Sequence, residues 1–311
     1  MAVYAFVFPG QGSQSVGMGQ DLAQAFPSAR AVFEEVDDAL GENLSKIIFE
    51  GPADNLTSTE NTQPALMAVS MAVLRVLETE GGLDLASTAT LLAGHSLGEY
   101  AALAAARSLG VAQTAKLLRL RGQAMQKAVP AGEGGMAALI GATLEQAEEI
   151  CAQSGGAGSL EVANDNGGGQ IVLSGKMASI DAAIALAKEM KIKRAVKLPV
   201  SAPFHSSLMR PAQDVMAEAL AQAQIMAPIV PVIANVTAAR ETDADTIRNN
   251  LVEQVTGRLR WRESVTEMGK TGIDTFVEFA AGKVPSVLAK RIEPDVSTPT
   301  TGTPAAVYAP L

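Results

Sequence analysis

The sequence predicts an α/β protein: a larger domain with a mainly parallel sheet, interrupted by a smaller domain of βαββαβ order. Three observations predict this fold class. Short apolar runs alternate with helical patterns through the first 129 residues, the composition changes at residues 130–135, and the segment from there to Val200 holds four strand patterns and two helix patterns. The chain of 311 residues is long enough for one large α/β domain with an insertion.

The larger domain begins with a buried strand. Tyr4–Phe8 is an apolar run that stops at Pro9-Gly10, a turn signal. The elements expected after it are helices at Asp21–Leu40 and Ala65–Glu78, a strand at Thr90–Ala93, and helices at Glu99–Ala106 and Val111–Val129. Strands that alternate with helices in this way favour a mainly parallel sheet.

The smaller domain spans residues 130–200. Its expected strands and helices, in chain order, are Met136–Ile140, Leu144–Gln153, Leu160–Ala163, Gln170–Ser174, Ile180–Met190 and Arg194–Val200. Thr143-x-x-Gln146 fits a capping box that opens the first helix. The order is the ferredoxin-like pattern, so we expect an inserted subdomain at 130–200 within a larger domain of residues 1–129 and 201–311. The tail Pro294–Leu311 is expected to be irregular.

Composition and charge exclude several classes of protein. The formal net charge is −9 and the basic residues form no long run, so nucleic acid is a poor partner. The apolar N-terminus, Met1–Phe8, is too short for a membrane span or a signal peptide. The single cysteine, Cys151, excludes an internal disulfide and favours a reducing compartment, so we expect a cytoplasmic protein. No cluster of residues has metal-ligand spacing, so we expect no metal.

A candidate nucleophile lies between an expected strand and an expected helix. Gly94-His95-Ser96-Leu97-Gly98 matches G-x-S-x-G, in which a sharp strand-to-helix turn exposes the serine Oγ. The N-terminus of the following helix offers N–H groups to a developing oxyanion. An ordinary glycine-rich turn is the alternative, but the strand-to-helix context favours Ser96 as the nucleophile.

The base is chosen from only two histidines. His95 adjoins the nucleophile, and neighbouring side chains diverge at such a turn, so His95 is a poor base. His205 lies in a loop after an expected strand, where active sites of α/β proteins are built. We therefore expect His205 to be the base. Spacing alone identifies no acidic partner for it.

Arg121 is expected to point inward. In the helix Val111–Val129 it lies three or four residues from Leu117, Leu118 and Met125, which form the apolar stripe. A buried guanidinium is costly without an anion. Two interpretations stay open: a structural ion pair, or a clamp for the carboxylate of a substrate, which the planar guanidinium suits.

Several ordered motifs resemble those of malonyl-CoA:acyl-carrier-protein transacylases and, more distantly, the acyltransferase domains of fatty-acid and polyketide synthases. The resemblance runs from Phe6 to about Arg291. The matching motifs are Phe8-Pro9-Gly10-Gln11-Gly12-Ser13-Gln14, Thr62-Gln63-Pro64-Ala65-Leu66, Gly94-His95-Ser96-Leu97-Gly98-Glu99-Tyr100, Arg121-Gly122-x-x-Met125 and Pro199-Val200-Ser201-Ala202-Pro203-Phe204-His205. The chain departs from the family at Ala280-Ala281-Gly282, where Gly-Pro-Gly is frequent, and lacks a proline before Arg260-Trp261.

The resemblance implies an α/β-hydrolase-like core with a ferredoxin-like insertion, Ser96 as nucleophile and His205 as base. It also implies an oxyanion hole made by the N–H groups of Gln11 and Leu97. By the same resemblance, Arg121 would hold the malonyl carboxylate, and the backbone carbonyl of Gln254 would orient His205.

The implied activity is transfer of malonyl from malonyl-CoA to the phosphopantetheine thiol of acyl carrier protein. The route is a ping-pong mechanism through a malonyl-Ser96 ester that supplies extender units for fatty-acid synthesis, with no cofactor besides the coenzyme A thioester substrate. The expected partners are therefore acyl carrier protein and malonyl-CoA, with neither nucleic acid nor membrane. A serine hydrolase is the alternative enzyme, and a carrier-docking module without catalysis is the alternative outside enzymes.

Overall fold

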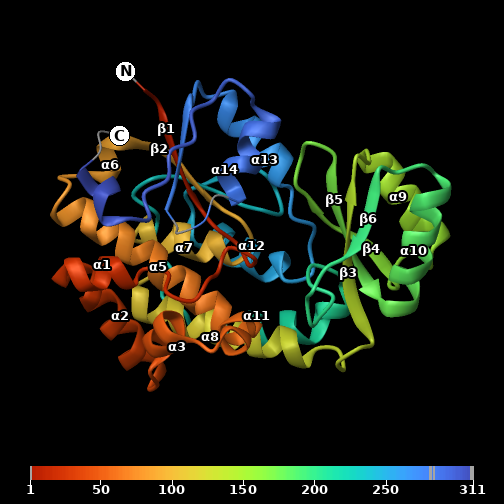
Figure 1. Ribbon diagram of the computed structural model, residues 1–311, viewed down its shortest axis with the longest axis horizontal. Coiled ribbons are helices and arrows are strands. Elements are labelled where there is room, and N and C mark those ends of the chain that lie inside the picture. The colour runs from red at the N-terminus through yellow and green to blue at the C-terminus, as the bar shows by residue number, and fades with distance from the viewer. Residues whose placement is uncertain (1, 280–281, 283, 309–311) are drawn as a thin grey trace.

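Two sheets lie side by side along the long axis of the molecule in the computed structural model (Figure 1), which describes residues 2–279, 282 and 284–308. The larger sheet has the strand order β8-β7-β2-β1-β9, and the smaller sheet has the order β4-β5-β3-β6. The strands are β1 (Tyr4–Phe8), β2 (Ala89–Gly94), β3 (Gly134–Ile140), β4 (Leu160–Asp165), β5 (Gln170–Lys176), β6 (Arg194–Lys197), β7 (Val232–Ile233), β8 (Arg240–Glu241) and β9 (Thr275–Glu278).

Helices surround the larger sheet and cover one side of the smaller one (Figure 1). The α-helices are α1 (Gln20–Ala25), α2 (Pro27–Leu40), α3 (Leu44–Glu50), α4 (Ala53–Thr57), α5 (Thr59–Thr79), α6 (Leu85–Thr88), α7 (Leu97–Ala105), α8 (Val111–Lys127), α9 (Leu144–Gln153), α10 (Met177–Glu189), α11 (Arg210–Gln222), α12 (Ala244–Gln254), α13 (Trp261–Gly269) and α14 (Val284–Ile292). Two 3₁₀ helices are η1 (Ser207–Met209) and η2 (Pro304–Tyr308). No helix in the described part of the chain is long and apolar enough to cross a membrane.

The larger sheet is mixed, with a parallel centre. β1 pairs in parallel with β2 and β9, β2 pairs in parallel with β7, and only β8 runs antiparallel. Both faces of β1 are buried: Phe6 and Phe8 pack among residues of α2, α5 and α7, whereas Ala5 and Val7 pack among residues of α13 and α14. Burial on both faces explains the continuous apolar run of this strand. The expected α/β class is confirmed.

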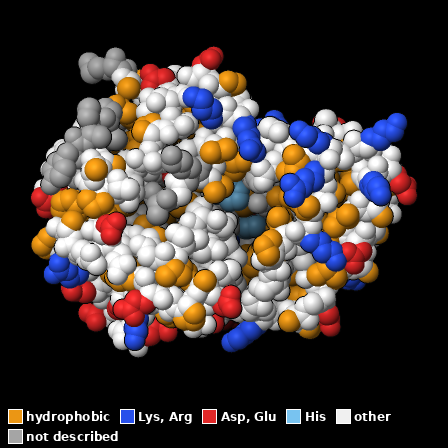
Figure 2. All heavy atoms as spheres, viewed as in Figure 1, with side chains coloured by type: hydrophobic (Ala, Val, Ile, Leu, Met, Phe, Trp, Pro, Cys, Tyr) orange, Lys and Arg blue, Asp and Glu red, His pale blue; other side chains and the backbone are white. Residues whose placement is uncertain are grey.

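The smaller sheet is antiparallel and has two different faces. Ala137 and Leu139 of β3 pack against α9 and α10, whereas Met136 and Ala138 belong to the core that continues into the larger part of the molecule. This alternation is the period-2 pattern of a strand buried on both sides. The inner face of the smaller sheet therefore forms one wall of the space between the two sheets. Figure 2 shows that space as a hollow in which histidine side chains are visible.

Most expected elements exist, but several boundaries were wrong. The helix expected at Asp21–Leu40 is divided at Phe26, which is extended because Pro27 follows it. The helix expected to begin at Ala65 begins at Thr59 and contains Pro64. The strand expected to reach Val200 ends at Lys197, because Pro199 has no N–H to continue the ladder. The predicted capping box of Thr143 and Gln146 is confirmed.

The described part of the C-terminal tail, residues 294–308, is mostly irregular, as expected, yet it is attached to the larger sheet. Isolated bridges join Ser297 to Thr275 and Thr300 to Glu278 of β9. The departure from the family pattern at residues 280–282 falls on Ala280 and Ala281, which lie outside the described residues.

Candidate active site

Ser96 occupies a strained turn between β2 and α7. Its backbone has φ 55° and ψ −112°, a region that residues with a Cβ seldom adopt. A Cβ on Gly94 would lie 1.9 Å from the carbonyl carbon of Gly98, and a Cβ on Gly98 would lie 2.4 Å from the carbonyl oxygen of Phe8. The two glycines therefore allow β1, β2 and α7 to meet closely enough to make the turn, as the motif predicts.

His205 contacts Ser96. Its Nε2 lies 2.8 Å from Ser96 Oγ, and its Nδ1 lies 2.8 Å from the backbone carbonyl oxygen of Gln254. Because a carbonyl only accepts, Nδ1 carries the proton and Nε2 presents its lone pair to the serine. Burial, and secondarily the positive charge of Arg121, lower the pKa of His205 from 6.5 to about 3. The imidazole is therefore neutral at physiological pH.

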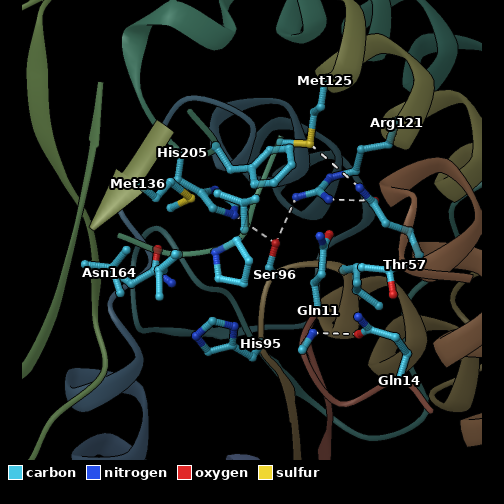
Figure 3. Close-up of a pocket in the computed structure, with 18 residues that line it drawn as sticks. Gln11, Gln14, Thr57, His95, Ser96, Arg121, Met125, Met136, Asn164 and His205 are labelled. Carbon is cyan, nitrogen blue, oxygen red and sulfur yellow. Dashed lines mark hydrogen bonds between the residues drawn. The ribbon is translucent and has the colours of Figure 1, made fainter. Parts of the chain in front are cut away.

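His95 faces away from this pair. Its Nε2 lies 2.9 Å from Asn166 Oδ1, and its ring meets the edge of Trp261 at 5.5 Å between centroids. Figure 3 shows the His95 ring apart from Ser96 and His205. Of the two histidines, only His205 has the geometry of a base for Ser96.

The Arg121 guanidinium is fully enclosed, with 1% of the residue exposed. Nη1 donates to Gln63 Oε1 at 2.7 Å, and Nη2 donates to Ser96 Oγ at 3.1 Å and to Gln254 Oε1 at 2.9 Å. Nε has no partner among the described residues, which also place no ion pair on this side chain. The structural ion pair considered from sequence is therefore not what holds Arg121.

A close helix crossing brings Arg121 to Gln63. A Cβ on the next residue, Gly122, would lie 2.6 Å from Cα of Glu60, so α8 can approach the first turn of α5 only with glycine at this position. Sequence reasoning did not single out Gln63 as a contact of Arg121. The motif Thr62-Gln63-Pro64 was the signal that could have found it.

Two further polar residues of the site, Glu99 and Asn235, were not predicted. Asn235 Oδ1 accepts from the Ser96 N–H at 2.8 Å, and its Nδ2 donates to the Gly94 carbonyl at 2.8 Å. Glu99 Oε2 accepts from the Asn235 N–H at 3.0 Å and from Gln254 Nε2 at 2.7 Å. Burial raises the pKa of Glu99 from 4.5 to about 7, against the lowering effect of these hydrogen bonds and of Arg121.

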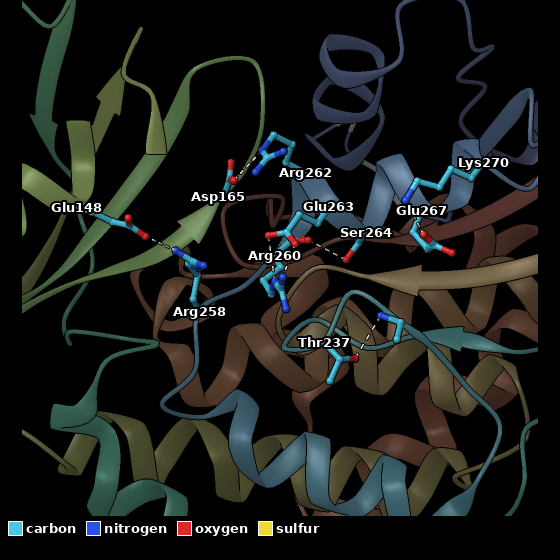
Figure 4. Close-up of polar contacts among 11 residues, drawn as sticks. Glu148, Asp165, Thr237, Arg258, Arg260, Arg262, Glu263, Ser264, Glu267 and Lys270 are labelled. Carbon is cyan, nitrogen blue, oxygen red and sulfur yellow. Dashed lines mark hydrogen bonds and ion pairs between the residues drawn. The ribbon is translucent and has the colours of Figure 1, made fainter. Parts of the chain in front are cut away.

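The segment between α12 and α13 ties this network to the smaller sheet. The Arg260 N–H donates to the Asn235 carbonyl at 2.9 Å, and the Asp165 N–H donates to the Leu259 carbonyl at 2.9 Å. Figure 4 shows ion pairs beside these bonds: Arg262 with Asp165 at 2.8 Å, and Arg258 with Glu148 at 2.9 Å. Asn235, which accepts from the Ser96 N–H, is thereby linked through residues 259–260 to β4 of the smaller sheet.

A cavity of about 270 Å³ is lined by Ser96. Gln11 and Leu97 both line it, together with Ser96, Arg121 and His205. Neither the Gln11 N–H nor the Leu97 N–H has an acceptor in the hydrogen-bond network of the described residues. The rest of the lining is largely apolar and includes Met125, Met136, Val172, Leu198, Val200 and Phe204. No group of three or more His, Cys, Asp or Glu side chains suited to a metal occurs in the described part of the chain.

This arrangement suits acyl transfer to a serine. A half-buried hydroxyl contacts a neutral imidazole, two N–H groups without an acceptor belong to residues that line the same cavity, and a buried cation lies beside the hydroxyl. The cation favours an acyl group that carries its own negative charge.

The comparisons with known proteins agree with this geometry. The acyl transferase domain family matches residues 5–294. The chain is 43% identical to the malonyl CoA-acyl carrier protein transacylase of Bacillus subtilis (strain 168), over 96% of this chain and 93% of that protein. It is similar to the crystal structure of acyl-carrier-protein-S-malonyltransferase from Bartonella henselae, with 54% identity and a TM-score of 0.95 over 98% of this chain and 97% of the other.

A further similar structure, with 38% identity and a TM-score of 0.94 over 98% of each chain, is a malonyl-transacylase in complex with a type II polyketide-synthase acyl-carrier protein. Identity of this level over nearly whole chains shows the family as well as the fold. The chain belongs to the acyl transferase domain family and, within it, to the malonyl CoA-acyl carrier protein transacylases.

Proposed function

We propose that the chain transfers a malonyl group from malonyl-CoA to the phosphopantetheine thiol of an acyl carrier protein through an ester on Ser96, and so supplies extender units for fatty-acid synthesis. One observation carries the proposal: Ser96 Oγ contacts both His205 Nε2 at 2.8 Å and Arg121 Nη2 at 3.1 Å. A base and a carboxylate-binding cation at one hydroxyl are what malonyl transfer requires.

In the first half-reaction, Ser96 Oγ attacks the thioester carbonyl of malonyl-CoA while His205 Nε2 takes the hydroxyl proton. The N–H groups of Gln11 and Leu97 stabilise the negative charge on the carbonyl oxygen. Collapse of the tetrahedral intermediate breaks the carbon–sulfur bond, and His205 returns the proton to the coenzyme A thiolate. Throughout, the Gln254 carbonyl holds the Nδ1 proton and fixes the ring.

In the second half-reaction the carrier thiol replaces coenzyme A. His205, neutral again, takes the thiol proton as sulfur attacks the malonyl ester, and returns it to Ser96 Oγ as the ester bond breaks. Coenzyme A leaves before the carrier thiol reacts with the malonyl-Ser96 ester, so the mechanism is ping-pong. Arg121 binds the malonyl carboxylate in both half-reactions through its guanidinium.

We also propose an α/β-hydrolase-like catalytic domain of residues 1–129 and 201–311 with an inserted ferredoxin-like subdomain at 130–200. The turn of Ser96 between β2 and α7 supports the first part. The antiparallel order β4-β5-β3-β6, with α9 and α10 on one face, supports the second. The cytoplasmic location and the absence of a metal or cofactor stay predictions.

The carrier partner needs a docking surface, and we propose the basic residues at the edge of the smaller sheet. In this family the carrier is acidic, whereas the chain carries a net charge of −9. The exposed basic residues from the end of α10 to β6 are Lys188, Lys191, Lys193, Arg194 and Lys197, and Lys290 and Arg291 of α14 are exposed as well. Figure 2 shows Lys and Arg side chains on both sides of the hollow. Lys193→Glu with Arg194→Glu should raise the KM for the carrier and weaken its salt dependence, with malonyl-CoA hydrolysis unchanged. An unaltered carrier KM would remove this surface from the docking site.

An assay with labelled malonyl-CoA and carrier protein distinguishes the proposed transferase from a serine hydrolase and from a docking module without catalysis. Label on the carrier supports the proposed function. Release of free malonate at the same rate with and without carrier would instead indicate a serine hydrolase, and no turnover would indicate a docking module without catalysis. The buried cation at the nucleophile disfavours the hydrolase, because an uncharged acyl group would leave it without an anion.

A further inference from the structure

Glu99 is a buried carboxyl group that does not touch the cavity. It lies in the first turn of α7, three residues after Ser96, and 3% of it is exposed. Its Oε2 accepts two hydrogen bonds, from the Asn235 N–H and from Gln254 Nε2. The mechanism described above makes no use of this group.

The partner of Glu99 is the side-chain amide of Gln254, and this amide has one satisfactory orientation. Its Nε2 faces three acceptors: Glu99 Oε2, the Ser96 carbonyl and Asn235 Oδ1. Its Oε1 accepts from Arg121 Nη2 at 2.9 Å. Turning the amide over would place an oxygen against those acceptors and an NH₂ group against a guanidinium that can only donate.

Among the three acceptors, Glu99 holds the amide most firmly. Its distance to Nε2 is 2.7 Å, against 3.1 Å for the Ser96 carbonyl and 3.3 Å for Asn235 Oδ1. It is also the only one of the three that can carry a negative charge, and hydrogen bonds to charged groups are the stronger kind. The Asn235 N–H fixes the carboxyl itself at 3.0 Å.

We propose that Glu99 is a positioning residue for acyl selection: it holds the Gln254 amide so that Oε1 faces Arg121, and thereby aims the guanidinium at the malonyl carboxylate. The inference rests on the proposed function, since it takes Arg121 as the malonyl clamp. Without Glu99 the amide keeps only its two longer contacts, to the Ser96 carbonyl and to Asn235 Oδ1. It is then held less firmly, and so is the acceptor that it offers to the guanidinium. The backbone carbonyl of Gln254, which orients His205, is not part of this effect.

The test compares acylation of Ser96 by malonyl-CoA and by acetyl-CoA in single-turnover experiments, followed by mass spectrometry. In Glu99→Ala, malonyl acylation should fall by roughly 10- to 100-fold, the size expected for a charge-assisted hydrogen bond. Acetyl acylation and modification of Ser96 by phenylmethylsulfonyl fluoride, which is uncharged, should change by less than about threefold. The preference for malonyl therefore shrinks while the nucleophile stays reactive.

Glu99→Gln is the conservative variant. Its side-chain oxygen can accept both hydrogen bonds that Glu99 accepts but carries no charge, so most of the malonyl preference, and more than in Glu99→Ala, should return. Glu241→Gln is the matched control, because Glu241 is a nearby carboxylate that contacts Asn250 and lies outside the Gln254 network. It should leave the preference unchanged. Should Glu99→Ala fail to fold by circular dichroism, Glu99→Asp replaces it, since aspartate withdraws the acceptor by one methylene.

Two results would overturn the proposal. A folded Glu99→Ala that keeps the full malonyl preference would show that Glu99 does not aim the clamp. An equal loss of preference in Glu99→Gln and Glu99→Ala would show that the charge and not the amide orientation matters. Failure of the proposed function looks different, because wild-type protein would then form no malonyl ester on Ser96 or show no malonyl preference.

Discussion

Arg121 Nη2 donates a hydrogen bond to Ser96 Oγ at 3.1 Å, so the cation and the nucleophile are in direct contact. A carboxylate that binds this guanidinium must therefore lie close to the carbonyl carbon that the serine attacks. In a malonyl group only one methylene separates the two. The contact consequently fits a short dicarboxylate, and under the proposed function Arg121 selects the acyl group directly beside the atom that attacks it.

Removing the guanidinium should abolish the preference for malonyl. In Arg121→Ala the malonyl carboxylate would enter a largely apolar cavity without a partner, so its transfer should collapse. An acetyl group leaves the wild-type guanidinium unpaired, at a cost of roughly 3–5 kcal/mol, which corresponds to a preference of about two to four orders of magnitude. The measurement is kcat/KM for malonyl-CoA and acetyl-CoA in both proteins. Arg121→Ala should accept acetyl-CoA as well as wild type does, or better.

Arg121→Lys is the matched control for charge. It keeps the positive charge but loses the planar fork that donates to Gln63 and Gln254, so it should keep only part of the preference. If Arg121→Ala retained the malonyl preference of the wild type, the clamp would have to be another residue.

The low pKa of His205 should be visible in the pH dependence of acylation. Burial first, and then the charge of Arg121, lower this pKa from 6.5 to about 3. The rate of Ser96 acylation should therefore show no loss from protonation of His205 between pH 8 and pH 5. In the unfolded chain the imidazole binds its proton near pH 6.5, so the same shift makes the folded state less stable as the pH falls below that value. A single-turnover rate that fell with an apparent pKa near 6.5 would contradict this.

The turn of Ser96 should not tolerate a side chain at Gly94. An added Cβ would lie 1.9 Å from backbone atoms of Gly98, so β2 and α7 would have to move apart. We expect Gly94→Ala to lower the free energy of unfolding by about 3 kcal/mol or more. Gly110→Ala is the control, because a Cβ there meets nothing within 4 Å, and it should change the value by about 1 kcal/mol at most. Equal stabilities of the two variants in denaturant titrations would refute the steric account.

Glu99 should make the protein less stable as the pH rises. Its pKa is raised to about 7 from an ordinary value of 4.5, chiefly by burial, with Arg121 opposing and Glu241 adding to the rise. The folded state thus holds the proton more tightly than the unfolded state, and the resulting stability, present in full below pH 4.5, is lost as the pH rises through 7.

The measurement is the unfolding free energy of wild type and Glu99→Gln between pH 5 and pH 8. Wild type should lose roughly 3 kcal/mol relative to the variant across this range. A constant difference between the two proteins would contradict a raised pKa.

Much of this site follows from local sequence. Ser96 lies in a motif whose glycines and flanking elements are contiguous, and His205 stands out because the chain has two histidines. Arg121 follows from helical periodicity. Each of these residues can be identified from neighbouring residues in the sequence or from a residue count, without knowledge of the fold.

The supporting network does not follow in the same way. Glu99 of α7 contacts Gln254, Asn235 after β7 contacts Ser96, and Gln63 of α5 contacts Arg121. These contacts join segments that are far apart in the sequence, so they exist only after the sheet has formed. The sequence does not distinguish these buried polar residues from polar residues that are exposed to solvent. The helix boundary at Pro64 was misplaced for a related reason: packing of α8 on α5 at Gly122 outweighs the local cost of a proline inside the helix.

The most direct test of the account is the site of the malonyl ester. Protein incubated with malonyl-CoA, quenched in acid and digested should carry one malonyl group on the peptide that contains Ser96, and addition of carrier protein before the quench should remove it. Ser96→Ala should carry none. A malonyl ester on any other residue, or an ester on Ser96 that the carrier thiol cannot discharge, would contradict the proposed mechanism.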